Sequence, residues 1–139
     1  MAKLGGRASY GKGAFVEKIT EAKTLTMGDS GKVFTIDASG AAYSITLPKA
    51  ADAGAGWNCR FISTTNGNII TIEPDSSEDT LIGHIASVDT SAGETSESGV
   101  DELKFLAACA PGDFCELICD GSNFYIWGIE HANDHMTLT

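Results

Sequence analysis

The segment Asp113–Glu130 constrains the fold of this chain more than any other. It reads "DFCELICDGSNFYIWGIE" and contains two runs of six to seven residues rich in β-branched and aromatic side chains. The residues between the runs, "DGSN", are of the types that form tight turns. We therefore predict an antiparallel hairpin here. We expect other strands of the chain to pair with it and extend it into a sheet.

Shorter strand-like runs with turn residues between them recur along the chain, at the spacing of about 8–12 residues that is typical of sandwiches and barrels. "TTNG" separates two of these runs and predicts a second hairpin around Asn66-Gly67. The sequence therefore predicts an all-β fold, a single antiparallel β-sandwich or barrel of jelly-roll-like type. The runs are Lys32–Asp37, Tyr43–Pro48, Trp57–Ser63, Asn68–Glu73 and a short one bent at Gly83.

Composition divides the chain into three parts around this one domain. Residues 1–26 are basic and glycine-rich, and we expect an extended N-terminal arm. Residues 27–130 form the predicted sandwich, with a polar surface loop over residues 89–99. Residues 131–139 are predicted to be a polar C-terminal tail.

Charge is distributed unevenly, which bears on the partners. Residues 1–32 hold six of the nine basic residues and three acids, whereas residues 33–139 hold three basic residues and sixteen acids. The acidic body repels phosphates, so we expect no direct nucleic-acid partner. No apolar run approaches the ~18 residues of a membrane helix, and the start of the chain lacks the apolar core of a signal peptide. We expect no membrane partner and no export.

The stretch "GDSGK" at Gly28–Lys32 repeats the residues around the nucleophile of trypsin-like proteases. In that arrangement His and Asp precede the serine, whereas all three histidines here follow Ser30. We interpret Ser30 as a turn residue. We expect no catalytic residue in the chain and no enzymatic activity.

Four cysteines could suggest disulfides, but their spacing argues against a framework. Cys115 and Cys119 on one strand would lie about 13 Å apart, beyond the roughly 7 Å that a disulfide allows. We expect buried free thiols at Cys59, Cys109, Cys115 and Cys119.

Two groups of side chains raise the question of a metal. His131 and His135 would share one face of a helix, but a solvated tail is the favoured interpretation there. The acids Glu73, Asp75, Glu78 and Asp79 lack the calcium-loop pattern and are interpreted as a solvated face. We expect no metal and no cofactor.

Four aromatic residues could stack on sugars in a carbohydrate-binding module, although aromatics that alternate on strands belong more often to the core. They are Trp57, Phe124, Tyr125 and Trp127.

The order of several short motifs resembles a small β-rich module of tailed bacteriophages. The motifs are "DSGK" at Asp29–Lys32, "TLP" at Thr46–Pro48, "CRFI" at Cys59–Ile62 and "LICDGSNFY" at Leu117–Tyr125. Together they span roughly residues 27–130, and the module occurs in capsid decoration (cement) proteins and in tail-fibre proteins.

The resemblance implies a structural virion protein that is made in the host cytoplasm and binds the capsid exterior. Its expected partners are the major capsid protein and further copies of itself, in a homotrimer that stabilises capsomer contacts. The alternative is a receptor- or glycan-binding module of a tail fibre or baseplate, with Trp57 or Tyr125 as an exposed platform. The charge pattern makes the basic arm the expected shell contact, with candidates Lys3, Arg7, Tyr10, Lys12, Phe15 and Lys18.

Overall fold

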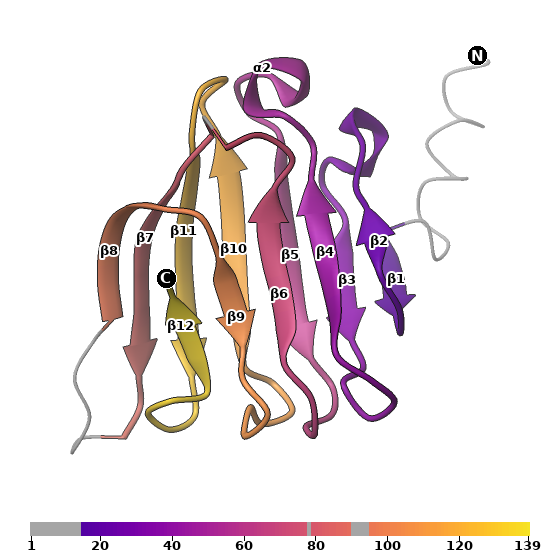
Figure 1. The fold of residues 1–139 in the computed structure, drawn as a ribbon, viewed down its shortest axis with the longest axis vertical. Coiled ribbons are helices and arrows are strands. Elements are labelled where there is room, and N and C mark those ends of the chain that lie inside the picture. The colour runs from indigo at the N-terminus through magenta and orange to yellow at the C-terminus, as the bar shows by residue number, and fades with distance from the viewer. Residues whose placement is uncertain (1–14, 78, 90–94) are drawn as a thin grey trace, which may run out of the picture.

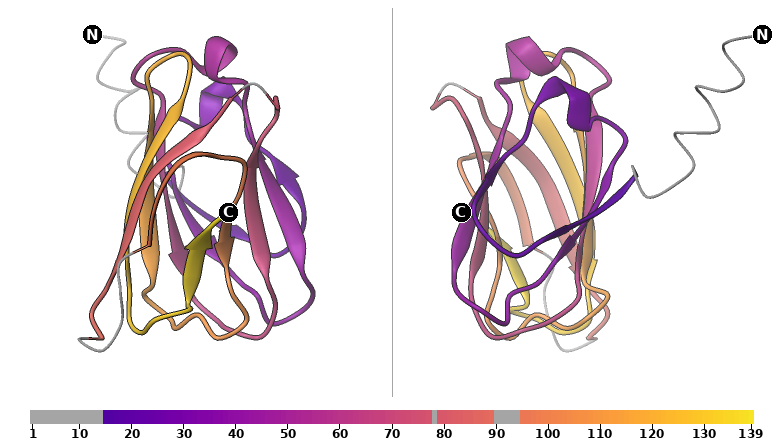
Figure 2. Two further views of the ribbon diagram at one scale, coloured as in Figure 1. Left: turned by 60° about the vertical axis from the view of Figure 1, so that its left-hand side comes forward. Right: turned by 90° about the vertical axis from the view of Figure 1, so that its right-hand side faces the viewer.

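The computed structural model describes residues 15–77, 79–89 and 95–139, and these form two β-sheets packed face to face (Figures 1 and 2). The seven-stranded sheet, here called sheet A, has the order β1-β3-β5-β10-β11-β7-β8. The five-stranded sheet, sheet B, has the order β12-β9-β6-β4-β2. The predicted all-β sandwich is confirmed.

Each strand is short, as the turn residues between the runs require. Sheet A contains β1 (Val16–Ile19), β3 (Val33–Ile36), β5 (Asn58–Ser63), β7 (Leu81–Ser87), β8 (Thr95–Val100), β10 (Phe114–Cys119) and β11 (Phe124–Glu130). Sheet B contains β2 (Lys23–Thr24), β4 (Tyr43–Leu47), β6 (Ile70–Pro74), β9 (Leu103–Phe105) and β12 (Met136–Leu138). A 3₁₀ turn at Met27–Asp29 and the one-turn helix α2 (Ala50–Ala53) complete the described elements.

The sheets are mixed, so the prediction of an antiparallel sandwich is wrong in this respect. From β1 to β7 successive strands enter opposite sheets, and as far as β6 the strands that are two apart in the chain are parallel neighbours. For the same reason β5 and β6 form no hairpin across "TTNG". Thr64 and Asn68 donate instead to carbonyls at the end of β3, those of Ile36 and Ala38.

The hairpin predicted at Asp113–Glu130 is confirmed. β10 and β11 pair antiparallel from Phe114 opposite Ile129 to Cys119 opposite Phe124. Asp120 closes the turn by accepting hydrogen bonds from the backbone N–H groups of Ser122 and Asn123, both at 2.7 Å.

The core lies between the sheets and contains the inward-facing residues of both. Phe34 and Phe61 stack with ring centroids 5.5 Å apart, and Trp57 meets Phe124 edge-on at 5.9 Å. All four cysteines are free thiols with buried side chains, as predicted. Burial raises the pKa of the Cys59 thiol well above its usual value, because the thiolate would lose its hydration.

The sandwich extends past the expected boundaries at both ends. β1 and β2 lie within the expected arm, and β12 lies within the expected tail. The polar segment 89–99 is also shorter as a loop than expected, because residues from Thr95 onward pair with β7 as strand β8. Residues 1–14 and 90–94 lie outside the described residues.

Candidate binding surface

The outer face of sheet A exposes large apolar side chains in its centre. Strand β11 alternates strictly, so Phe124 and Ile126 enter the core while three side chains point outward. These are Tyr125, Trp127 and Ile129, with 39%, 43% and 44% of their surface exposed. Apolar residues therefore occupy both faces of this strand, and its outer face is a candidate binding surface.

Strand register places further side chains beside these three. Glu116 of β10 lies opposite Trp127 of β11, and Arg60 of β5 lies opposite Glu116. Two residues along β10 on the same face, Ile118 lies between Tyr125 and Asn58. The row through Trp127 continues from Arg60 to residues of β3 and β1, Val33 and Val16.

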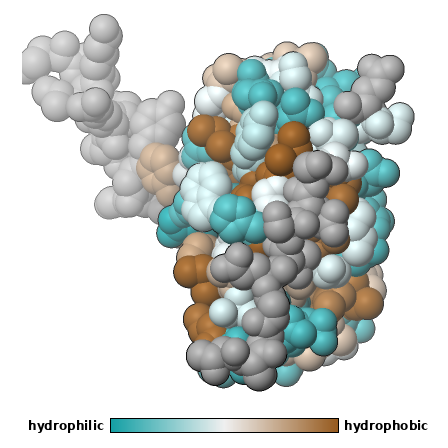
Figure 3. Space-filling view, turned by 90° about the vertical axis from the view of Figure 1, so that its left-hand side faces the viewer, coloured by the Kyte–Doolittle hydropathy of each residue, from teal (hydrophilic) through white to brown (hydrophobic). Residues whose placement is uncertain are grey.

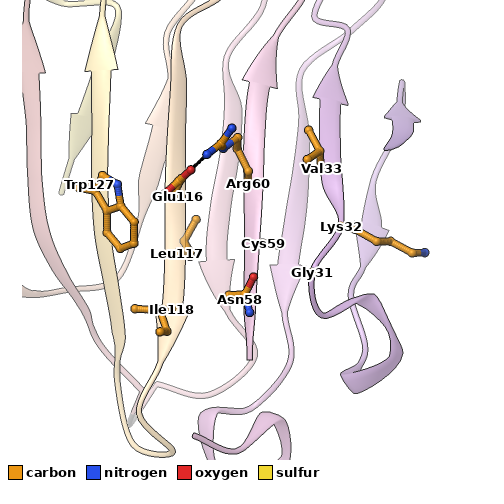
Figure 4. A pocket seen from close by; sticks show the side chains of 10 residues that line it. All are labelled: Gly31, Lys32, Val33, Asn58, Cys59, Arg60, Glu116, Leu117, Ile118 and Trp127. Atoms are coloured by element: carbon orange, nitrogen blue, oxygen red, sulfur yellow. Dashed lines mark ion pairs between the residues drawn. The ribbon is translucent and has the colours of Figure 1, made fainter. Parts of the chain in front are cut away.

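A shallow groove of about 420 Å³ runs across this face, and Figure 4 shows the side chains that line it. Arg60 and Glu116 form an ion pair in its centre, with Arg60 about half exposed. The Arg60 guanidinium also lies 5.7 Å from the centre of the Phe114 ring, which holds it against the sheet. The lining residues from the described chain are Gly31, Lys32, Val33, Asn58, Cys59, Arg60, Glu116, Leu117, Ile118 and Trp127.

A network of ion pairs holds the N-terminal edge, by which we mean residues 15–24 with strands β1 and β2. Lys32 bonds Asp29 at 2.7 Å and Glu17 at 3.0 Å, and Lys23 also bonds Glu17. Hydrogen bonds from Lys23 and Lys32 lower the pKa of Glu17, because they favour its charged form. The motif "GDSGK" therefore provides a turn and a lysine that fix β1 to the sandwich.

Ser30 is a turn residue, as predicted. It follows the 3₁₀ turn, and its hydroxyl accepts a hydrogen bond from the Asn58 N–H at 3.3 Å. The next residue, Gly31, has a φ of 82°. The described histidines lie elsewhere in the fold.

The C-terminal segment is tied to the sandwich, which corrects the interpretation of residues 131–139 as a solvated tail. Asp113 is 2% exposed and accepts hydrogen bonds from His135 Nδ1, the His131 N–H and the Ala110 N–H. Glu130 accepts two more, from the N–H groups of His135 and Met136. The two carboxylates thus anchor the crossing from β11 to β12.

Burial raises the pKa of Glu130, because desolvation outweighs the hydrogen bonds that favour its charged form. The cluster around Asp113 and Glu130 does not form a metal site. Among the residues that the structure describes, no three His, Cys, Asp or Glu side chains are grouped to hold an ion. Its partners are mainly backbone N–H groups, and its evident role is structural.

The sequence-predicted platforms divide between core and surface. Trp57 is buried, and its indole N–H donates to the Thr26 carbonyl at 3.1 Å, so the prediction that it forms an exposed platform is wrong. Phe124 is also buried, whereas Tyr125 and Trp127 are exposed. For the residues of β11 the sequence could not decide between core and surface, because both faces of this strand are apolar.

The acidic residues that follow β6 also differ in their burial. Asp79 is buried and accepts a hydrogen bond from the Ala50 N–H at the start of α2, at 2.8 Å, so it is not part of a solvated face. Asp75 is exposed, and Glu78 lies outside the described residues.

Of the expected shell contacts, Phe15 and Lys18 are described. Both are exposed. Phe15 directly precedes β1, and Lys18 lies on β1, where it pairs with Asp37 at 2.6 Å. Lys3, Arg7, Tyr10 and Lys12 lie outside the described residues.

Seen from the side of β7 and β8, the surface mixes hydrophobic and hydrophilic side chains (Figure 3). No helix in the described part of the chain has the length and apolar character needed to cross a membrane. No family model, curated protein or solved structure matches the chain.

Proposed function

We propose that the chain is a decoration protein of a tailed-phage head, which binds the outer surface of the major capsid protein and stabilises contacts between capsomers. The order of its motifs supports this proposal, and one structural observation carries it. β1 and β2 are the outermost strands of their sheets, so both sheets end at the segment to which the basic residues 1–14 are joined.

An outermost strand presents backbone N–H and C=O groups that can pair with a second protein. The N-terminal edge adds apolar surface to these groups, because Phe15 is 43% and Val16 is 56% exposed. Such an edge can extend a sheet of a capsid subunit or pack against it. The binding energy then comes from buried area and from many copies bound to one shell.

Charge at this edge permits contact with an acidic surface. Lys18, Lys23 and Lys32 are balanced there by Glu17, Asp29 and Asp37 through direct ion pairs. Residues 33–139 as a whole carry sixteen acids against three basic residues. The N-terminal edge and the basic segment before it are therefore the part of the chain that an acidic shell repels least.

Co-sedimentation with expanded capsids that lack the protein tests this proposal. The wild-type chain should bind saturably, and a variant without residues 2–12 should occupy fewer sites. Val16→Asp should also reduce occupancy, because the contact with the capsid would bury the new carboxylate without a partner. Val88→Asp is the matched control, since Val88 is 58% exposed and follows β7, away from this edge.

Equal occupancy for the wild type, the truncated chain and Val16→Asp would contradict a contact through the N-terminal edge. Absence of any binding to capsids by the wild-type chain would contradict the decoration role itself.

A further inference from the structure

We propose that the groove on the outer face of sheet A binds a short, uncharged oligosaccharide, with Trp127 as the stacking platform. This inference does not depend on the proposed capsid contact, because the groove lies over β3, β5, β10 and β11 and its lining includes no residue of β1 or β2. It rests on the combination of an exposed indole with hydrogen-bonding side chains in one groove.

Trp127 supplies the apolar part of the site. Its side chain lies on the outer face of β11 and is 43% exposed, whereas the inward-facing side chains of the same strand are buried. The apolar C–H face of a sugar ring packs on an aromatic ring, while the ring's hydroxyls remain at its rim. Ile118 extends the apolar floor beside the indole (Figure 4).

Arg60, Glu116 and Asn58 supply the polar part. Arg60 and Glu116 pair with each other and still reach the surface, so the pair offers both donors and acceptors to neighbouring hydroxyls. Asn58 is exposed, and its amide nitrogen donates to the Gly56 carbonyl at 2.9 Å. Its amide oxygen can accept a further hydrogen bond.

The row of side chains sets the size of the ligand. Val33, Arg60, Glu116 and Trp127 lie on four adjacent strands. At about 4.8 Å between strands, the row is about 14 Å long. A linear ligand of a few sugar units therefore fits along it.

The balanced charges of the groove favour an uncharged ligand. The one central cation and the one central anion of the groove, Arg60 and Glu116, neutralise each other. Lys32 is held by Asp29 and Glu17, and its side chain points away from the other labelled side chains in Figure 4. A protein of net charge −10 also repels polyanions, which disfavours a nucleic acid as the occupant.

Isothermal titration calorimetry with maltotriose, cellotriose and triacetylchitotriose, each added separately at millimolar concentration, tests the site. We expect saturable binding of at least one, with a Kd in the micromolar to millimolar range. Trp127→Ala should weaken that binding at least tenfold. Ile129→Ala is the matched control, because Ile129 lies on the same face of the same strand, is 44% exposed and does not line the groove.

Circular dichroism and urea unfolding establish that both variants fold, so a loss of binding reports on the site. Fluorescence gives a second readout in the wild type, because Trp57 is buried and Trp127 is the exposed one of the two tryptophans. Failure of all three sugars to bind, or an equal loss in both variants, would overturn the proposal. Capsid binding by Trp127→Ala should remain at the wild-type level.

Discussion

At the scale of single residues, Gly83 shows how closely the strands of sheet A approach. It lies opposite Ile126 in the parallel pair of β7 and β11. A Cβ atom at this position would lie 1.8 Å from the Ile126 carbonyl oxygen, which is part of the backbone and cannot move aside. The glycine is therefore required by the pairing.

Gly83→Ala should lower the free energy of unfolding by about 2 kcal/mol or more, because β7 must shift away from β11. Gly40→Ala is the matched control, since no heavy atom lies within 4 Å of its added Cβ, and it should change stability by less than about 1 kcal/mol. Urea denaturation of both variants measures the difference. Similar midpoints would contradict the tight approach at Gly83.

Glu17 predicts a dependence of stability on pH. Because Lys23 and Lys32 lower its folded-state pKa below the ordinary 4.5, its contribution is complete above that value and is lost as the pH falls through the folded-state pKa. Glu17→Gln should therefore be less stable than the wild type at neutral pH, and the difference should shrink as the pH falls below 4.5. Urea unfolding across this range provides the test, and a difference that stays constant would contradict the ion-pair network.

At the scale of elements, the sequence predicted strands better than their partners. The hairpin of β10 and β11 was predictable because its strands and its turn are adjacent in the chain. Strands β5 and β6 carry a similar signal, yet they enter different sheets, because Thr64 and Asn68 bond the end of β3. That contact joins residues far apart in sequence and leaves no local pattern.

The C-terminal strand was missed for a related reason. β12 is three residues long, and its place beside β9 is fixed by hydrogen bonds from the His131 N–H to Asp113 and from the Met136 N–H to Glu130. Similarly, the sequence placed aromatic residues on β11 but could not tell that Trp127 faces solvent. Only the packing of Phe124 and Ile126 against sheet B decides that orientation.

Asp113→Asn tests the anchoring of this element. Both carboxylate oxygens accept hydrogen bonds, so an amide nitrogen at either position would face a donor. We expect a loss of about 1–3 kcal/mol in the free energy of unfolding. Asp134→Asn in the same segment is the control, because asparagine tolerates the φ of 64° found there, and it should be nearly neutral. Comparable losses in both variants would contradict the anchoring role of Asp113.

At the scale of the whole molecule, the sandwich is open at two opposite ends. β1 ends sheet A on one side and β8 ends it on the other (Figure 1). Exposed edges favour association, and because the edge at β1 is the proposed capsid contact, the edge at β8 is the one that a symmetric neighbour can cover. We expect a homotrimer in solution, which light scattering after size exclusion would show as three times the chain mass of 14.5 kDa. A single-chain mass at micromolar concentration would contradict it.

The capsid contact is the central claim, and electron cryomicroscopy of expanded heads saturated with the purified protein tests it most directly. The proposal predicts extra density at the three-fold and quasi-three-fold positions of the outer surface, with the N-terminal edge of each copy towards the shell. Bare shells, or density that places β1 and β2 away from the major capsid protein, would contradict it.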